Sequence, residues 1–251
     1  MFNIKKVKLA RRILQYVTGF LFKLFQINLR YREKRKDYNL ELFEYFYLPW
    51  RTDEEFNELY KIFADFTLNP KSRLYTIYDF SIKYLKENTA FIEVGTWKGG
   101  VTGILASKYR NNNIDIYACD TFSGVAKTSD KDTFFSGSEY SDAEVNDLKK
   151  IENLAKKKIN IIPGIFPQSM QNVNLSKKFS FAHIDVDTYQ SAKQSFEYIT
   201  NNSIVGAVII LDDYGGWFTD GITLFGNELM KNNNYFSVPN HLGQLIVLKL
   251  K

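Results

Sequence analysis

The 251-residue sequence has a single cysteine, Cys119, and its only histidines are His183 and His241. One cysteine excludes an intrachain disulfide and a four-cysteine zinc site, and it favours a reducing compartment, which we take to be the cytoplasm. The G-x-G-x-x-G spacing of a dinucleotide-binding loop is also missing, because Trp97 stands where the second glycine should be. A dinucleotide-binding loop is therefore less favoured.

Basic residues are concentrated at the N-terminus and are outnumbered by acids elsewhere. Residues 1–36 hold eleven Lys or Arg and one acid, a net charge of +10, whereas the rest of the chain holds 22 bases and 27 acids. Phosphate contacts need bases around a binding site, so the acidic body argues against nucleic acid as a partner of the main domain. Apolar residues make up 45% of the chain, which is enough for a sizeable core and excludes wholesale disorder.

The N-terminal apolar stretch, residues 13–25, is shorter than the roughly 20 residues that a membrane-spanning helix needs. No small-residue cleavage site follows it, so a signal peptide also fits poorly. Residues 1–48 are predicted to form a basic, amphipathic helical segment. One helical face carries the apolar side chains of Ile13, Val17, Phe20, Leu21 and Leu24. Two interpretations stay open: residues 1–36 bind the inner face of an anionic membrane, or the helix packs on the domain or on a second subunit of a homo-oligomer.

Residues 49–251 are predicted to form one α/β domain, because short apolar strands alternate with helical stretches. We expect strands at residues 89–94, 114–119, 159–162, 179–184, 205–211, 235–238 and 244–250, and helices at 74–85, 99–109, 142–157, 190–199 and 222–230. This alternation predicts a doubly wound, mostly parallel sheet. Residues 239–243 are too few for a parallel crossover, so the last two strands should form an antiparallel hairpin. Such a seven-stranded, Rossmann-like sheet fits methyltransferases that use S-adenosylmethionine better than dehydrogenases.

A glycine-rich turn follows the first predicted strand and reads Glu93-Val94-Gly95-Thr96-Trp97-Lys98-Gly99-Gly100. Glycines at a strand-to-helix turn take positive φ and let the backbone approach a ligand closely. A buried carboxylate at Glu93 needs a partner, and the ammonium group of a methionine moiety is one natural choice. Asp120 follows the second strand, where a carboxylate accepts hydrogen bonds from ribose hydroxyls. These features favour a cofactor site, although a structural turn with two structural acids remains the alternative.

Two pairs of acids follow two apolar strands at matching ends. Asp185 and Asp187 come after the fourth strand, and Asp212 and Asp213 come after the fifth. Neighbouring strands lie about 4.8 Å apart, so the four carboxylates should converge, and a hard divalent cation such as Mg²⁺ would relieve their repulsion. The alternative is four acids that are solvated separately. We predict Asp185, Asp212 and Asp213 as metal ligands and Asp187 as the base, with Asp185 and Asp187 as the catalytic pair.

These segments resemble the macrocin O-methyltransferase family, which methylates sugar hydroxyls in macrolide and aminocoumarin biosynthesis. The resemblance spans roughly residues 63–249 and is carried by Ser72-Arg73-Leu74, the glycine-rich turn, Asp120-Thr121-Phe122-Ser123-Gly124, Gly164-Ile165-Phe166-Pro167, His183-Ile184-Asp185-Val186-Asp187-Thr188-Tyr189, Asp212-Asp213-Tyr214-Gly215 and Gly243-Gln244. It implies a sugar O-methyltransferase that uses S-adenosylmethionine and Mg²⁺. We expect cofactor contacts at Glu93, Gly95, Thr96, Trp97, Gly99, Gly100, Asp120, Thr121 and Phe122. Residues 122–140 would form part of a lid over the acceptor.

Other interpretations remain open at this stage. The basic N-terminal segment would suit an acceptor on a lipid-linked glycan or a polysaccharide precursor, and a small-molecule acceptor is equally compatible. His183 is expected to be a structural core residue or to line the acceptor site. The spacing of Tyr189 and Lys193 keeps an NAD-dependent, sugar-modifying oxidoreductase as an alternative. A non-catalytic, membrane-associated scaffold with a methyltransferase-like fold is another.

Overall fold

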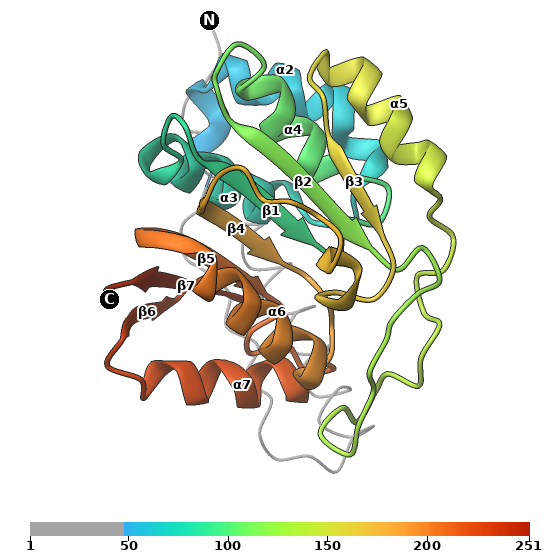
Figure 1. The fold of residues 1–251 in the computed structure, drawn as a ribbon, viewed down its shortest axis with the longest axis vertical. Coiled ribbons are helices and arrows are strands. Elements are labelled where there is room, and N and C mark those ends of the chain that lie inside the picture. The colour runs from blue at the N-terminus through green and yellow to red at the C-terminus, as the bar shows by residue number, and fades with distance from the viewer. Residues whose placement is uncertain (1–47) are drawn as a thin grey trace, which may run out of the picture. The chain divides into compact units, whose positions relative to one another are not determined.

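A seven-stranded mixed sheet runs through residues 48–251, the part of the chain that the computed structural model describes (Figure 1). Its strands are β1 (Ala90–Val94), β2 (Asp115–Asp120), β3 (Asn160–Pro163), β4 (Phe179–Ile184), β5 (Ser203–Asp212), β6 (Tyr235–Pro239) and β7 (Gln244–Lys249). They lie in the order β3-β2-β1-β4-β5-β7-β6, with the first five parallel and β7 antiparallel to both of its neighbours. The strand order reverses between β1 and β4, and ligands of such sheets bind at the carboxyl edge near that point.

Helices cover both faces of this sheet (Figure 1). One layer consists of α2 (Glu54–Phe63), α3 (Lys71–Tyr84), α4 (Gly100–Lys108) and α5 (Val145–Ala155), and the other of α6 (Tyr189–Asn201) and α7 (Asp220–Met230). Three short 3₁₀ turns, η1 (Pro49–Thr52), η2 (Ala64–Phe66) and η3 (Gln168–Met170), join these elements. Because the sheet is buried on both sides, its central strands are mostly apolar on both faces, and each polar side chain on them needs a partner.

Side chains alternate between the two layers along each strand, and this alternation decides where the polar ones lie. On β1, Phe91 belongs to the core beneath α2–α5, whereas Ile92 belongs to the core beneath α6 and α7. Glu93 therefore faces the α2–α5 layer. It is aligned with His183 on β4, which in turn is aligned with Ile210 on β5. The polar side chains of the sheet centre thus share the face that carries α3 and α4.

The predicted fold is confirmed, including the doubly wound parallel sheet and the terminal antiparallel hairpin. Two of the differences from the prediction have a local cause in helix capping. The helix expected from residue 142 begins at Val145, because Glu144 and Asp147 form a capping box at that point. The helix α2 was not predicted; Asp53 caps it by accepting a hydrogen bond from the backbone N–H of Phe56.

Within residues 48–251, no helix combines the length and the apolar character needed to cross a membrane. The predicted N-terminal segment lies outside the described residues, apart from Leu48. Its membrane-binding and subunit-packing interpretations therefore both stay predictions.

Candidate active site

The loops that follow β1 to β5 enclose a pocket of about 350 Å³ at the carboxyl edge of the sheet. Nine of the predicted site residues line it: Glu93, Gly95, Thr96, Trp97, Asp120, Thr121, Asp185, Asp187 and Asp213. Gly99, Gly100, Phe122 and Asp212 are not part of this lining. The volume is within the usual range for a small-molecule site. The pocket brings the glycine-rich turn and the acid cluster, predicted from separate motifs, into one site.

The glycine-rich turn is tight because the protein itself fills the space beside it. Gly95 has φ 86°, and a Cβ there would lie 1.7 Å from the main-chain oxygen of Asp185. A Cβ on Gly99 would lie 2.7 Å from the side chain of Leu148, and one on Gly100 would lie 2.9 Å from the main chain of Phe66. In this structure the three glycines make room for protein atoms. The absence of a side chain at Gly95 lets the end of β1 approach the acid-bearing end of β4.

Asp120 holds together the two loops beside it. Its Oδ2 accepts a hydrogen bond from the backbone N–H of Trp97, and its Oδ1 accepts one from that of Phe122, both at 2.8 Å. Burial raises the pKa of this carboxyl, and the backbone donors partly oppose the rise. Trp97 and Phe122 have left-handed backbones, with φ 47° and 51°. Asp120 therefore stabilises two strained residues at the wall of the pocket.

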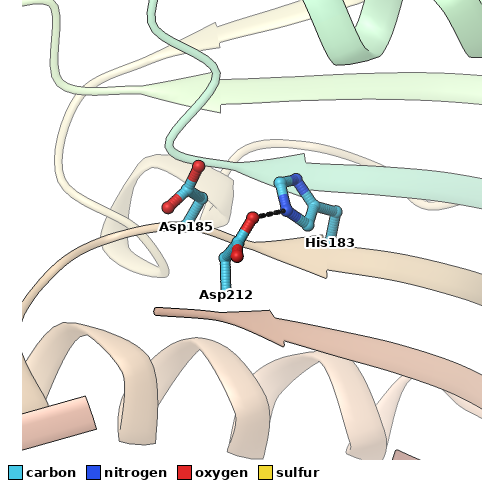
Figure 2. Close-up of side chains that lie close together, drawn as sticks. All are labelled: His183, Asp185 and Asp212. Atoms are coloured by element: carbon cyan, nitrogen blue, oxygen red, sulfur yellow. Dashed lines mark hydrogen bonds and ion pairs between the residues drawn. The ribbon is translucent and has the colours of Figure 1, made fainter. Parts of the chain in front are cut away.

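A buried chain of side chains crosses the sheet beneath the pocket. The Nδ1 of His183 lies 3.0 Å from Oε1 of Glu93, and its Nε2 lies 3.1 Å from Oδ2 of Asp212. Figure 2 shows His183 and Asp212 on the adjacent strands β4 and β5. Thr102 of α4 donates a hydrogen bond to the other carboxylate oxygen of Glu93. Burial favours neutral His183, but the bonds to Asp212 and Glu93 outweigh it and raise its pKa to about 10.

The acids converge as predicted, in two overlapping groups. His183, Asp185 and Asp212 form one, and Asp185, Asp187 and Asp213 form the other; in each, potential ligand atoms lie within 4.8 Å of one another. The three predicted metal ligands are divided between these groups: Asp212 belongs only to the first, Asp213 only to the second, and Asp185 to both. Burial and the charges of Asp212 and Asp213 raise the pKa of Asp185 well above its usual value. Burial and Asp213 raise that of Asp187 to about 8, as expected for carboxyls that repel one another.

Sequence reasoning gave no role to two residues that contact the acids. Arg73 of α3 donates from Nη1 to Oδ1 of Asp213 at 2.7 Å and lies 3.0 Å from Oδ1 of Asp212. Its Nε donates to the main-chain oxygen of Leu242 at 2.7 Å. Asn69 donates from Nδ2 to Oδ2 of Asp185 at 2.9 Å. The only signal in the sequence was the place of Arg73 within a family motif, because these contacts join residues more than one hundred positions apart.

Residues 122–140, the predicted lid, run beside the pocket without regular secondary structure. Asp132 fixes this loop, because its Oδ1 accepts a hydrogen bond at 2.8 Å from the backbone N–H of Tyr189, the first residue of α6. Phe134 contacts Trp217 and Phe218, with ring centroids 6.0 and 5.7 Å apart. These three residues form an aromatic rim: Phe218 lines the pocket, while Phe134 and Trp217 are 56% and 61% exposed.

Comparison with known families gives one clear match. A family model described as macrocin O-methyltransferase (TylF) matches residues 65–232. That range includes the glycine-rich turn, Asp120, Arg73 and both pairs of acids. No curated protein matches the sequence.

Solved structures with the same fold include several O-methyltransferases. The calicheamicin methyltransferase CalS11 aligns with a TM-score of 0.60 and 13% identity, over 86% of this chain and 98% of that one. The O-methyltransferase NovP aligns with a TM-score of 0.58 and 14% identity, over 72% of this chain and 79% of that one. An O-methyltransferase from Bacillus cereus, solved with S-adenosylhomocysteine (SAH), aligns with a TM-score of 0.50 and 18% identity, over 81% of this chain and 94% of that one. At these identities the likeness shows the fold.

Proposed function

Because the chain belongs to the macrocin O-methyltransferase family, we propose that it transfers a methyl group from S-adenosylmethionine to a sugar hydroxyl with the help of a divalent cation. The observation that carries this proposal is the convergence of carboxylates beside the glycine-rich turn: Asp185, Asp187 and Asp213 line one pocket, and Asp212 offers an oxygen within 4.8 Å of one of Asp185. Methyl transfer to a hydroxyl needs both parts, an activated oxygen and a donor held in line with it.

The pocket has the features expected for a methyl donor that carries an ammonium group, a ribose and a purine. Its lining includes Glu93 and Asp120, the predicted partners of the ammonium and ribose groups. Two lining hydroxyls, Oγ1 of Thr96 and Oγ of Ser195, are buried without a hydrogen-bond partner. Unpartnered buried hydroxyls are costly, so both are ready to bond a polar ligand. The residues present therefore fit S-adenosylmethionine.

The acid cluster fits a hard divalent cation such as Mg²⁺. Its carboxylates offer only oxygen atoms as ligands, which suits such an ion. Burial, together with the charge of neighbouring carboxylates, raises the pKa values of Asp185 and Asp187. We propose Asp185, Asp212 and Asp213 as the residues that would hold the ion. When bound there, Mg²⁺ would supply a positive charge that lowers the pKa of the acceptor hydroxyl.

The residues of the chain have distinct tasks in this scheme. Asp187 accepts the hydroxyl proton, because it lies beside Asp185 and Asp213 but is not one of the three residues assigned to the ion. Asn69 holds Asp185 in place through the hydrogen bond to Oδ2, while Arg73 holds Asp213. Burial of the reacting groups in the pocket keeps water away from the sulfonium methyl group. Much of the acceleration then comes from positioning the two reactants.

We propose a sugar or glycan as the acceptor. One of the structures of CalS11 is described as a TDP-rhamnose 3'-O-methyltransferase, and the family model is named after a methyltransferase that acts on macrocin. The aromatic rim offers flat apolar faces at the pocket, against which the C–H face of a sugar ring can pack. Residues 122–140 would act as a lid over this acceptor.

The N-terminal segment is the basis of a separate proposal. Residues 1–36 carry a net charge of +10, so we propose that they hold the enzyme at the anionic inner face of a membrane, near a lipid-linked glycan precursor. Fractionation of the full chain and of a variant that lacks residues 1–36 tests this idea. Only the full chain should sediment with membranes, and recovery of both in the soluble fraction would overturn it.

The central test measures binding and turnover together. Calorimetry with SAH and with NAD should show binding of SAH alone. With S-adenosylmethionine and Mg²⁺, a panel that contains TDP-rhamnose and free glycosides should yield at least one product heavier by one methyl group. Binding of NAD without SAH would overturn the proposal, and SAH binding without any turnover across glycan extracts would favour a non-catalytic scaffold.

A further inference from the structure

His183 is a buried titratable residue that the proposed chemistry does not use, although it contacts both halves of the site. Its side chain is fully buried. One ring nitrogen contacts Glu93 at 3.0 Å, and the other contacts Asp212 at 3.1 Å (Figure 2). A core histidine needs only two satisfied nitrogens, and one backbone carbonyl and one hydroxyl would suffice for that. Here each partner is instead a carboxylate assigned to a different ligand.

We propose that His183 is a positioning residue that couples binding of the methyl donor to binding of the metal ion. The inference rests on the proposed function, in which Glu93 contacts the donor and Asp212 contacts the cation. The ring of His183 lies between the two carboxylates and contacts one of them through each nitrogen, so the position of one carboxylate depends on the position of the other. A ligand that orders either carboxylate leaves less conformational freedom to lose when the second ligand binds.

The other contacts of Glu93 and Asp212 strengthen the coupling between their positions. The second oxygen of Glu93 accepts a hydrogen bond from Thr102, and Oδ1 of Asp212 lies 3.0 Å from Nη1 of Arg73. Glu93 is 2% exposed and Asp212 is 1% exposed, so water does not screen these contacts. The chain of contacts therefore runs without a break from α4, through β1, β4 and β5, to α3.

Coupling between two sites has a quantitative signature that does not depend on turnover. Calorimetry on the full chain, with SAH as the donor probe, should show at least about fivefold tighter binding in saturating Mg²⁺ than in chelator. By reciprocity, SAH must tighten Mg²⁺ binding by the same factor. Equal SAH affinity of the wild-type chain in Mg²⁺ and in chelator would overturn the proposal.

Two variants each remove one of the two contacts that His183 makes with Glu93 and Asp212. In His183→Asn, the amide nitrogen takes the place of Nδ1, so the contact with Glu93 is kept and the contact with Asp212 is lost. In His183→Gln, the amide nitrogen takes the place of Nε2, so the contact with Asp212 is kept instead. We expect His183→Asn to retain SAH affinity in chelator and His183→Gln to retain Mg²⁺ affinity without SAH. Both should lose the fivefold coupling, and retention of coupling in both would overturn the proposal.

A second measurement covers the case in which neither variant folds. The chain has only two histidines, so ¹⁵N-labelled histidine gives ring signals from His183 and His241 alone. Mg²⁺ and SAH, added separately to the wild-type chain, should each shift the ring signals of His183, and unchanged signals with both ligands bound would overturn the bridge. Failure of the proposed function looks different, because the wild-type chain would then bind no SAH at all.

Discussion

The carboxylates in the two halves of the pocket have opposite surroundings. In the donor half, which follows β1 and β2, Asp120 accepts two backbone hydrogen bonds, and Glu93 is bonded to Thr102 and His183. In the acid half, which follows β4 and β5, Asp185 and Asp187 are crowded by other carboxylates, and their pKa values are raised. Carboxylates that accept hydrogen bonds from the protein fix the shape of a loop, whereas carboxylates crowded by other carboxylates repel one another and favour a cation. The acid half is thus the one whose carboxylate charge the protein leaves incompletely neutralised.

Backbone geometry, by contrast, is similar in the two halves. Trp97 and Phe122 in the donor half have left-handed φ angles, and so do Asp187 and Asp213 in the acid half, at 62° and 63°. Such conformations are uncommon for residues other than glycine and persist only where the surroundings enforce them. Each half therefore holds its functional side chains on strained turns, and the difference between the halves lies in their charge.

The largest expected effect is on turnover in the acid half. Asp187→Asn should reduce kcat by about 10²–10⁴-fold, because it removes the proposed base. Asp185→Asn is the matched control, since it removes the same charge two residues away. It should also lose turnover, but it alone should weaken Mg²⁺ binding. Initial rates and Mg²⁺ calorimetry measure the two effects, and equal Mg²⁺ affinity in both variants would refute the assigned roles.

The next effect concerns the contact at which the two halves meet. Gly95→Ala should lower the free energy of unfolding by about 2–5 kcal/mol, from the strained φ and from the clash with the main chain of Asp185. Gly215→Ala is the control: its φ is 79°, but no atom lies within 4 Å of the added Cβ. It should cost only about 1–2 kcal/mol. Urea denaturation of both variants gives the comparison, and equal losses would mean that the clash at Gly95 is relieved elsewhere.

Mg²⁺ should stabilise the folded protein through the acid half alone. At a concentration about 100 times its dissociation constant, it should raise the free energy of unfolding by about 2.7 kcal/mol. The doubly substituted variant Asp185→Asn, Asp213→Asn should lose most of this gain, because it keeps only one of the three proposed ligands. Thermal unfolding with Mg²⁺, against NaCl at matched ionic strength, measures it. A gain that survives the double substitution would place the ion elsewhere.

The smallest effect tests the donor end of the pocket. Ser195→Ala should weaken SAH binding by about two- to twelvefold, the loss of one ordinary hydrogen bond, and should stabilise the free protein slightly. Ser169→Ala is the matched control, because its hydroxyl is equally unpartnered but does not line the pocket. It should leave SAH binding unchanged. Calorimetry decides between them, and equal SAH affinity in all three proteins would contradict the role of Ser195.

The fold and the meeting of the acids could be predicted because both depend on local pattern. Alternating strands and helices imply a parallel sheet, and parallel strands end at the same edge, so Asp185 and Asp213 had to approach each other. Strand order completed the argument, since β4 and β5 are neighbours. No side-chain conformation was needed for this part of the prediction.

The bridge through His183 and the contacts of Arg73 could not be predicted in this way. Glu93 and His183 face each other only because β1 and β4 pair in one particular register, and spacing along the chain does not determine that register. Arg73 lies on a helix, and its direction depends on how α3 packs on the sheet. The glycines were expected to admit a ligand; at Gly95 the structure shows the main chain of Asp185 instead.

The bond from Arg73 to Leu242 also bears on how the protein is made. The two residues are 169 positions apart, and Leu242 precedes β7, which inserts between β5 and β6. During synthesis α3 leaves the ribosome early, but Arg73 can make its bond to Leu242 only after nearly all of the remaining chain has been synthesised. The end of β5, with Asp212, also lacks its second neighbour until then. A nascent chain that stops short of β7 would therefore carry all four acids but not their final arrangement, so that completion of the proposed metal site would follow completion of the chain.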